Sequence, residues 1–207
     1  MNIAVIDTGS ANTRSVETAL RRVGLEPTAV DDPGDVLAAD RVLLPGVGAF
    51  GAAMDQLRRQ ELLEPLRERL RAGWPTLAVC IGLQLLARTS EEENGIEGVG
   101  VLDAAVGRFE SSVRVPHMGW NRVHAPATAQ WITTGYAYFA NSYRVPGTSK
   151  DALETDGWSV ATCDYAGDFV AAVSREGVMA CQFHPELSGR WGLDLLSAWI
   201  ERTKETV

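Results

Sequence analysis

The pattern of apolar and polar residues in the first half of the chain alternates between two periods. A continuous apolar run at residues 3–6 and the segment 41–44, apolar from Val42 to Leu44, each predict a strand. Between them, the helical spacing i, i+3, i+4, i+7 is occupied by apolar residues: Val16, Ala19, Leu20 and Val23. Ser10 or Asn12 can cap this amphipathic helix, and Gly24 ends it. Strands that alternate with helices predict βαβ units and a parallel sheet.

The same alternation continues to about residue 90. Residues 27–30 predict another short strand. The apolar spacing over residues 52–72 predicts a long helix that Pro65 kinks or divides. Residues 75–79 then form an apolar run that leads directly into good helix formers.

After Ser90 the pattern changes to short apolar runs that Gly, Pro and Asp interrupt. Strands are predicted at residues 106–109, 113–115, 136–143, 158–163, 169–174 and 178–183. Residues 174–177 are typical of a hairpin turn, so this half is expected to be more antiparallel. A closing amphipathic helix is marked by Leu193, Leu196 and Ile200.

Taken together, these elements predict an α/β fold. We expect an open, mostly parallel central sheet flanked by helices, with a second and more antiparallel sheet region laid against it. No repeat or linker divides the chain, so residues 1–207 are expected to form a single domain.

Composition and charge exclude several classes of function. The chain has 19 Lys and Arg against 27 Asp and Glu, a formal net charge of −8, and no basic stripe that would bind nucleic acid. The apolar runs are too short to cross a membrane, and the N-terminus has no pattern of a signal peptide. Three cysteines without close spacing fit a cytoplasmic protein, and three scattered histidines predict no metal site.

The first candidate for chemistry is Cys80, between the strand at 75–79 and the helix that follows. The free N–H groups at a helix start favour a thiolate over a thiol, and Gly82 lets the helix pack close to the strand. This is the arrangement of the hydrolase nucleophile elbow, with sulfur in place of oxygen. The alternative is that Cys80 is a small core residue, since free cysteines are among the most buried types.

The second candidate is the glycine-containing turn at residues 45–48, directly after a strand. Its glycines expose backbone N–H groups that can point at a developing oxyanion. An ordinary strand-to-helix turn is the alternative. A dinucleotide fingerprint or a P-loop is excluded because the third glycine and the Gly-Lys-Ser/Thr sequence are absent.

The third candidate is the pair His184 and Glu186 at the end of a predicted strand. Residues two apart in extended chain point to the same side, so the carboxylate can hold one ring nitrogen and leave the other available. A histidine held in this way is a better base for a thiol. The alternative, a buried histidine beside a surface glutamate, explains this pair but not the two other candidates.

These three stretches carry a resemblance to a known superfamily. Residues 45–50 (Pro-Gly-Val-Gly-Ala-Phe), 79–84 (Val-Cys-Ile-Gly-Leu-Gln) and 182–186 (Gln-Phe-His-Pro-Glu) resemble, in order and spacing, the motifs of the triad (class I) glutamine amidotransferases. The resemblance implies a flavodoxin-like α/β fold. Residues 115–121 (Val-Pro-His-Met-Gly-Trp-Asn) and 138–143 are similar to the glutaminase subunits of imidazole glycerol phosphate synthases, and the likeness extends over residues 1 to about 200.

The resemblance implies specific catalytic roles. Cys80 would attack the side-chain amide of L-glutamine, His184 would transfer the protons, and Glu186 would orient His184. Backbone N–H groups of Ile81 and of the turn at residues 45–48 would bind the oxyanion. The residues implied in oxyanion or glutamine binding are Gly46, Val47, Gly48, Ile81, Gln84, Ser142 and Tyr143.

The resemblance also implies a partner and no cofactor. The partner would be a (β/α)8-barrel cyclase in a heterodimer, which would use the ammonia to make imidazole glycerol phosphate and AICAR in histidine biosynthesis. The residues expected to face it are Asn12, Met118, Trp120, Asn121 and Tyr138. The alternative for residues 116–121 is a core turn with a buried tryptophan, because aromatic residues and methionine are enriched in both cores and interfaces.

Three residues depart from the family pattern, and three other functions stay open. Ala78 replaces a usual glycine, Asn141 a common histidine, and Leu187 a frequent basic residue. The chain could be a paralogue that feeds ammonia to a different synthase, a catalytically silent scaffold, or a stand-alone thiol hydrolase of related fold.

Overall fold

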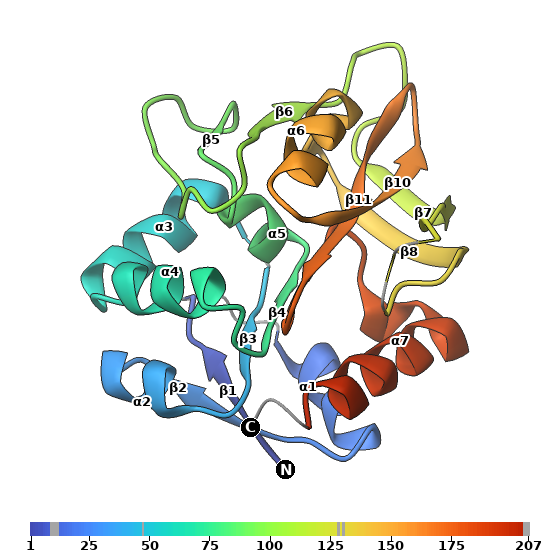
Figure 1. Cartoon of the computed structure of the whole chain (residues 1–207). Helices are drawn as coiled ribbons and strands as arrows, with labels where there is room; N and C mark the ends of the chain where they lie inside the picture. The colour runs from blue at the N-terminus through green and yellow to red at the C-terminus, as the bar shows by residue number, and fades with distance from the viewer. Residues whose placement is uncertain (9–12, 47, 128, 130, 205–207) are drawn as a thin grey trace.

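A seven-stranded sheet forms the centre of the computed structural model, which describes residues 1–8, 13–46, 48–127, 129 and 131–204 (Figure 1). The strand order is β10-β11-β12-β4-β3-β1-β2. The five strands that pair in parallel are β1 (Asn2–Ile6), β2 (Glu26–Val30), β3 (Val42–Leu44), β4 (Thr76–Val79) and β12 (Val178–Cys181). The antiparallel strands β11 (Asp168–Arg175) and β10 (Ser159–Asp164) extend the sheet at one side.

Helices cover both faces of this sheet, because its inner strands are apolar on both sides. The helices on one face are α2 (Pro33–Ala38), α3 (Phe50–Arg59) and α4 (Leu63–Arg71), and those on the other are α1 (Arg14–Arg22) and α7 (Gly189–Arg202) (Figure 1). In β3, Val42 and Leu44 belong to the first apolar layer and Leu43 to the second, as strand alternation requires.

Smaller elements surround the carboxyl ends of the parallel strands. A separate hairpin consists of β7 (His117–Val123) and β8 (Gly135–Asn141). Three short strands, β5 (Thr89–Ser90), β6 (Ala105–Arg108) and β9 (Tyr143–Arg144), form a third sheet. The remaining helices are α5 (Ile81–Leu85), α6 (Lys150–Thr155) and the 3-10 turns η1 (Gly147–Ser149) and η2 (Pro185–Leu187).

The buried side chain of Arg69 links α4 to the end of α2 and to the residue before β4. The side chain of Arg69 in α4 donates hydrogen bonds to the carbonyl oxygens of Val36 (3.0 Å) and Ala39 (2.7 Å) at the end of α2, and of Pro75 (3.0 Å) before β4. Burial lowers the pKa of Arg69 to about 10, although the charge of Asp40 raises it. Arg69 therefore satisfies the last carbonyls of α2, which have no partner within that helix.

The predicted fold class is confirmed, with corrections to individual elements. The long helix over residues 52–72 is wrong: two helices are separated before Pro65, at Glu61, which has a φ of 58°. Pro65 itself lies in the first turn of α4, where a missing N–H removes no helical hydrogen bond. The hairpin turn is confirmed, since β11 and β12 pair across Glu176 and Gly177.

Two strand predictions in the second half also need correction. Residues 113–115 form no strand. Val113 and Val115 are partly buried and pack against the apolar layer under α1 and α7. The run at 136–143 is interrupted at Ser142, which separates β8 from β9. The proposed caps Ser10 and Asn12 lie outside the described residues. In the part of the chain that is described, no helix has the length and apolar character needed to span a bilayer.

Candidate active site

Cys80 lies at the sharp corner between β4 and α5. Its φ of 54° and ψ of −109° are unfavourable for a residue with a side chain, which is typical of strained positions at functional sites. The backbone N–H of Cys80 donates to the carbonyl oxygen of Cys181 at 2.7 Å and so anchors the corner to β12. The side chain is only 5% exposed but lines a pocket.

Two glycines allow the turn after β3 to pack against this corner. A Cβ on Gly46 would lie 2.0 Å from the carbonyl oxygen of Val79 and 2.3 Å from the backbone nitrogens of Ile81 and Gly82. A Cβ on Gly82 would lie 2.4 Å from the carbonyl oxygen of Leu44. Only glycine fits at both positions, and the turn after β3 therefore lies directly against the first backbone N–H groups of α5.

His184 is held next to Cys80 by its backbone as well as by its ring. Its N–H donates to the carbonyl oxygen of Tyr138 in β8 at 2.9 Å, and its carbonyl accepts from the hydroxyl of Ser188 at 2.6 Å. Ring atom Nδ1 lies 2.9 Å from Oε1 of Glu186. Because a carboxylate only accepts, Nδ1 carries the proton and Nε2 is the nitrogen left for Cys80.

The environment of His184 favours its charged form. Burial lowers the pKa of His184, but hydrogen bonds and charge interactions with Cys80 and Glu186 outweigh burial and raise it to about 10. A protonated ring beside the sulfur stabilises a thiolate, which is the nucleophilic form of cysteine. The arrangement can therefore carry out nucleophilic attack and general acid–base chemistry at one place.

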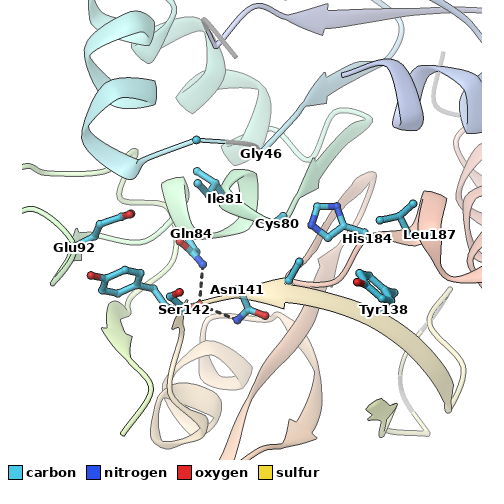
Figure 2. Close-up of a pocket in the computed structure, with 13 residues that line it drawn as sticks. Gly46, Cys80, Ile81, Gln84, Glu92, Tyr138, Asn141, Ser142, His184 and Leu187 are labelled. Carbon is cyan, nitrogen blue, oxygen red and sulfur yellow. Dashed lines mark hydrogen bonds between the residues drawn. The ribbon is translucent and has the colours of Figure 1, made fainter. Parts of the chain in front are cut away.

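A pocket of about 510 Å³ opens onto these groups (Figure 2). In Figure 2, Gln84 lies between Glu92, at one end, and Cys80 with His184, toward the other. The lining also includes five more of the residues predicted for oxyanion or glutamine binding: Gly46, Gly48, Ile81, Ser142 and Tyr143. The size and the mixed polar and apolar lining are suitable for a small polar substrate.

The carbonyl oxygen of Tyr143 organises the polar side of the pocket. It accepts one hydrogen bond from Nε2 of Gln84 and another from Nδ2 of Asn141, each at 2.9 Å (Figure 2). Asn141, which departs from the family pattern, thus makes a local hydrogen bond beside the candidate glutamine site. Gln84 also donates to Oε1 of Gln182 at 3.0 Å.

Comparison with known proteins agrees with this geometry. Residues 4–198 match the protein family described as Glutamine amidotransferase class-I. The chain belongs to the class-I glutamine amidotransferase family.

This amidotransferase has relatives that are similar over nearly its whole length. It is 42% identical over 206 residues to the imidazole glycerol phosphate synthase subunit HisH of Escherichia coli (strain K12), which covers 97% of this chain and 100% of that one. It is 39% identical over 203 residues to the chloroplastic imidazole glycerol phosphate synthase hisHF of Arabidopsis thaliana, covering 96% of this chain and 34% of that longer protein.

Solved structures agree on the fold. A crystal structure of a glutamine amidotransferase has a TM-score of 0.74 at 20% identity, over 97% of this chain and 98% of that one. The glutaminase domain of Trypanosoma brucei CTPS, solved with bound acivicin, has a TM-score of 0.63 at 18% identity, over 97% of this chain and 94% of that one. At these identities the likeness shows the fold alone.

The residues predicted to face a partner of this amidotransferase divide into two groups. Met118 and Trp120 on β7 are 63% and 57% exposed, and Tyr138 lies opposite Trp120 with ring centroids 6.2 Å apart. The Asn121 amide is instead occupied within the chain, where it donates to the carbonyl oxygen of Asp164 at 2.9 Å. Asn12, like Val47 of the oxyanion turn, lies outside the described residues.

Three residues of this site were missed from the sequence. Glu92 lines the pocket and accepts a hydrogen bond from the N–H of Phe50 at 3.0 Å. Ser188 holds the backbone of His184, and Gln182 approaches the sulfur of Cys80. Gln182 lies within a motif that the sequence did identify, but its role depends on contacts across two strands.

Proposed function

We propose that this amidotransferase hydrolyses L-glutamine to glutamate and ammonia with Cys80, His184 and Glu186 as its catalytic triad. The observation that supports this most directly is the convergence of a strained cysteine and a carboxylate-bound histidine at one pocket. The two groups come from segments about 100 residues apart in the chain; Gln182, two residues before His184, is 102 residues from Cys80.

In the first step, the Cys80 sulfur attacks the amide carbon of glutamine while His184 holds the proton that left the thiol. The resulting oxyanion is stabilised by the N–H of Ile81 and by the turn containing Gly46 and Gly48. His184 then gives its proton to the leaving nitrogen, the carbon–nitrogen bond breaks, and ammonia departs from a glutamyl thioester. Water, deprotonated by His184, hydrolyses the thioester and releases glutamate.

The pocket orients the substrate through its polar end. Both protons of the Gln84 amide are used within the chain, so its Oε1 is the atom available to accept from the substrate ammonium. The carboxylate of Glu92 adds a negative charge at the same end. We place the substrate carboxylate against the backbone of Ser142 and Tyr143, which leaves the side-chain amide of the substrate at Cys80.

The ammonia is used by a second protein. Ammonium forms readily in water and is no nucleophile, so ammonia has to pass directly to the next active site. We propose a cyclase with a (β/α)8 barrel that makes imidazole glycerol phosphate and AICAR in histidine biosynthesis, in a cytoplasmic heterodimer. The docking face is the exposed side of the β7–β8 hairpin around Met118, Trp120 and Tyr138, next to Leu187 at the pocket mouth.

The test is glutamate release measured with and without the cyclase, and with and without the ribotide substrate that the cyclase would convert. We expect strong stimulation by both together, and no glutamine-dependent product with Cys80→Ala. Equal rates under all conditions would show that the cyclase does not activate glutamine hydrolysis. The Cys80→Ala variant should retain cyclase binding, which serves as the control for folding.

The same experiment separates the alternative functions. A paralogue for another synthase would neither bind the cyclase nor be stimulated by it. A silent scaffold would show no effect of Cys80→Ala on product formation. A stand-alone thiol hydrolase would turn over other amides rapidly without a partner.

A further inference from the structure

The side chain of Gln182 is an amide in the interior next to the candidate nucleophile. It is 0% exposed and lies directly after β12, the strand adjacent to β4. Its Nε2 lies 3.8 Å from Sγ of Cys80, within the range of a hydrogen bond to sulfur. Its Oε1 accepts the hydrogen bond from Gln84 at 3.0 Å. Neither contact was expected from the sequence.

The direction of these hydrogen bonds follows from one backbone carbonyl. The carbonyl oxygen of Tyr143 can only accept, so the Gln84 atom that faces it at 2.9 Å has to be the amide nitrogen. The second proton on that nitrogen points to Gln182, whose facing atom therefore has to be its oxygen. The amide nitrogen of Gln182 is then left facing Cys80.

We propose that Gln182 donates a hydrogen bond to the Cys80 sulfur, which stabilises the thiolate formed when His184 takes the proton and keeps the sulfur aimed into the pocket, with Gln84 and the Tyr143 carbonyl fixing the direction of that bond. This inference rests on the proposed glutaminase function, because the sulfur it stabilises is the proposed nucleophile. Gln182 acts on Cys80 and makes no contact with the pocket itself, so it is a positioning residue.

The chain of hydrogen bonds also links the two ends of the substrate site. Gln84 lines the pocket at the polar end, and Gln182 reaches the sulfur at the reactive end. Donors to an ionised group stabilise it more than donors to a neutral group, so the bond strengthens when the thiol ionises. A directional donor also restricts the orientation of the sulfur before the attack, so less entropy is lost in reaching the transition state.

Other ionisable groups lie next to Cys80 in the described part of the chain. His184 interacts with it directly, and Glu186 holds the Nδ1 side of that ring. Cys181 on β12 is its neighbour but stays neutral, since burial and the charges of Glu186 and Cys80 raise the pKa of Cys181. Gln182→Met removes both the donor to Cys80 and the acceptor for Gln84, whereas Gln182→Glu keeps the acceptor.

The pH dependence of alkylation by iodoacetamide tests the proposal without glutamine turnover. Cys181 and Cys163 are fully buried, and the pKa of Cys163 is raised to about 12, so the reaction reports on Cys80. A Cys80→Ala protein supplies the background. In Gln182→Met, which keeps an unbranched chain of similar length without a donor, we expect the alkylation midpoint to rise by about one pH unit.

A second variant at position 182 and a control variant elsewhere complete the test. Gln182→Glu keeps an oxygen that accepts from Gln84; its ionised carboxylate has no donor and repels a thiolate, so its midpoint should also rise. Gln56→Met makes the same exchange on α3, away from the site, and should leave the midpoint unchanged. A role in packing alone would lower Tm without moving the midpoint. Midpoints that coincide with the wild type in folded Gln182→Met and Gln182→Glu would overturn the proposal.

The outcome is distinguishable from a failure of the proposed function. The wild-type complex with the cyclase is assayed for glutamate release in parallel. If it hydrolyses glutamine and the midpoints do not move, the inference about Gln182 is wrong and the proposed function stands. If the midpoints move but the wild-type complex releases no glutamate, the hydrogen bond exists and the glutaminase proposal is wrong.

Discussion

The close approach between the turn after β3 and the start of α5 makes Gly46→Ala a decisive substitution. The new Cβ would lie 2.0 Å from the carbonyl oxygen of Val79 and 2.3 Å from the nitrogens of Ile81 and Gly82. All three are backbone atoms, which cannot rotate away as a side chain can. The turn and the Cys80 corner therefore have to separate by more than 1 Å before the methyl group reaches ordinary contact distance.

The substitution is expected to affect both stability and catalysis. Overpacking of a well-packed interior lowers the free energy of unfolding by about 1–3 kcal/mol. A misplacement of about 1 Å between reacting groups lowers the rate by about 100-fold. Because the displaced atoms are the proposed oxyanion donors, we expect kcat of glutamine hydrolysis to fall by about 100-fold, with a much smaller change in KM.

The assay is glutamate release by the complex with the cyclase, together with urea unfolding of the variant. Gly107→Ala on β6 is the matched control, since its Cβ would meet only the Glu91 carboxylate at 3.5 Å, an ordinary contact. The control should keep wild-type kcat. If Gly46→Ala folds and its kcat stays within about twofold of the wild type, the turn does not serve as an oxyanion site.

Three further predictions address charge, docking and stability. Because the folded pKa of His184, about 10, lies above its ordinary value of 6.5, its interactions stabilise the fold fully below pH 6.5 and are lost as the pH rises through about 10. Urea unfolding of Glu186→Gln should therefore differ most from the wild type near pH 6 and converge with it toward pH 10; a difference that grows with pH contradicts this sign. Trp120→Ala should weaken cyclase binding by about 2 kcal/mol in calorimetry without lowering Tm, whereas Trp74→Ala, an exposed tryptophan before β4, should not affect binding. Arg69→Met should lower the free energy of unfolding by about 2–4 kcal/mol, because buried carbonyls lose their donor, while kcat of the folded protein is unchanged; a variant as stable as the wild type would show that water replaces the guanidinium.

The parts of the site that the sequence predicted are those carried by local geometry. A cysteine between a buried strand and a helix has to occupy a corner, and His184 and Glu186 are two residues apart, so their proximity needs no knowledge of the fold. Glu92 and Gln182 could not be predicted in the same way. Glu92 reaches the pocket by capping the start of α3, which lies 42 residues before it, and Gln182 contacts a sulfur 102 residues away.

The amino-acid sequence by itself determined the alternation of strands and helices and the mostly parallel sheet, and it supplied the candidates for the reactive groups, because periodicity and short motifs are properties of neighbouring residues. Only the tertiary structure decided which polar atoms meet, since the strand order places β12 beside β4 and an isolated bridge joins Tyr138 of the separate β7–β8 hairpin to His184. It also decided the exposure of Trp120 and the burial of Gln182, two side chains whose environment depends on what packs against them.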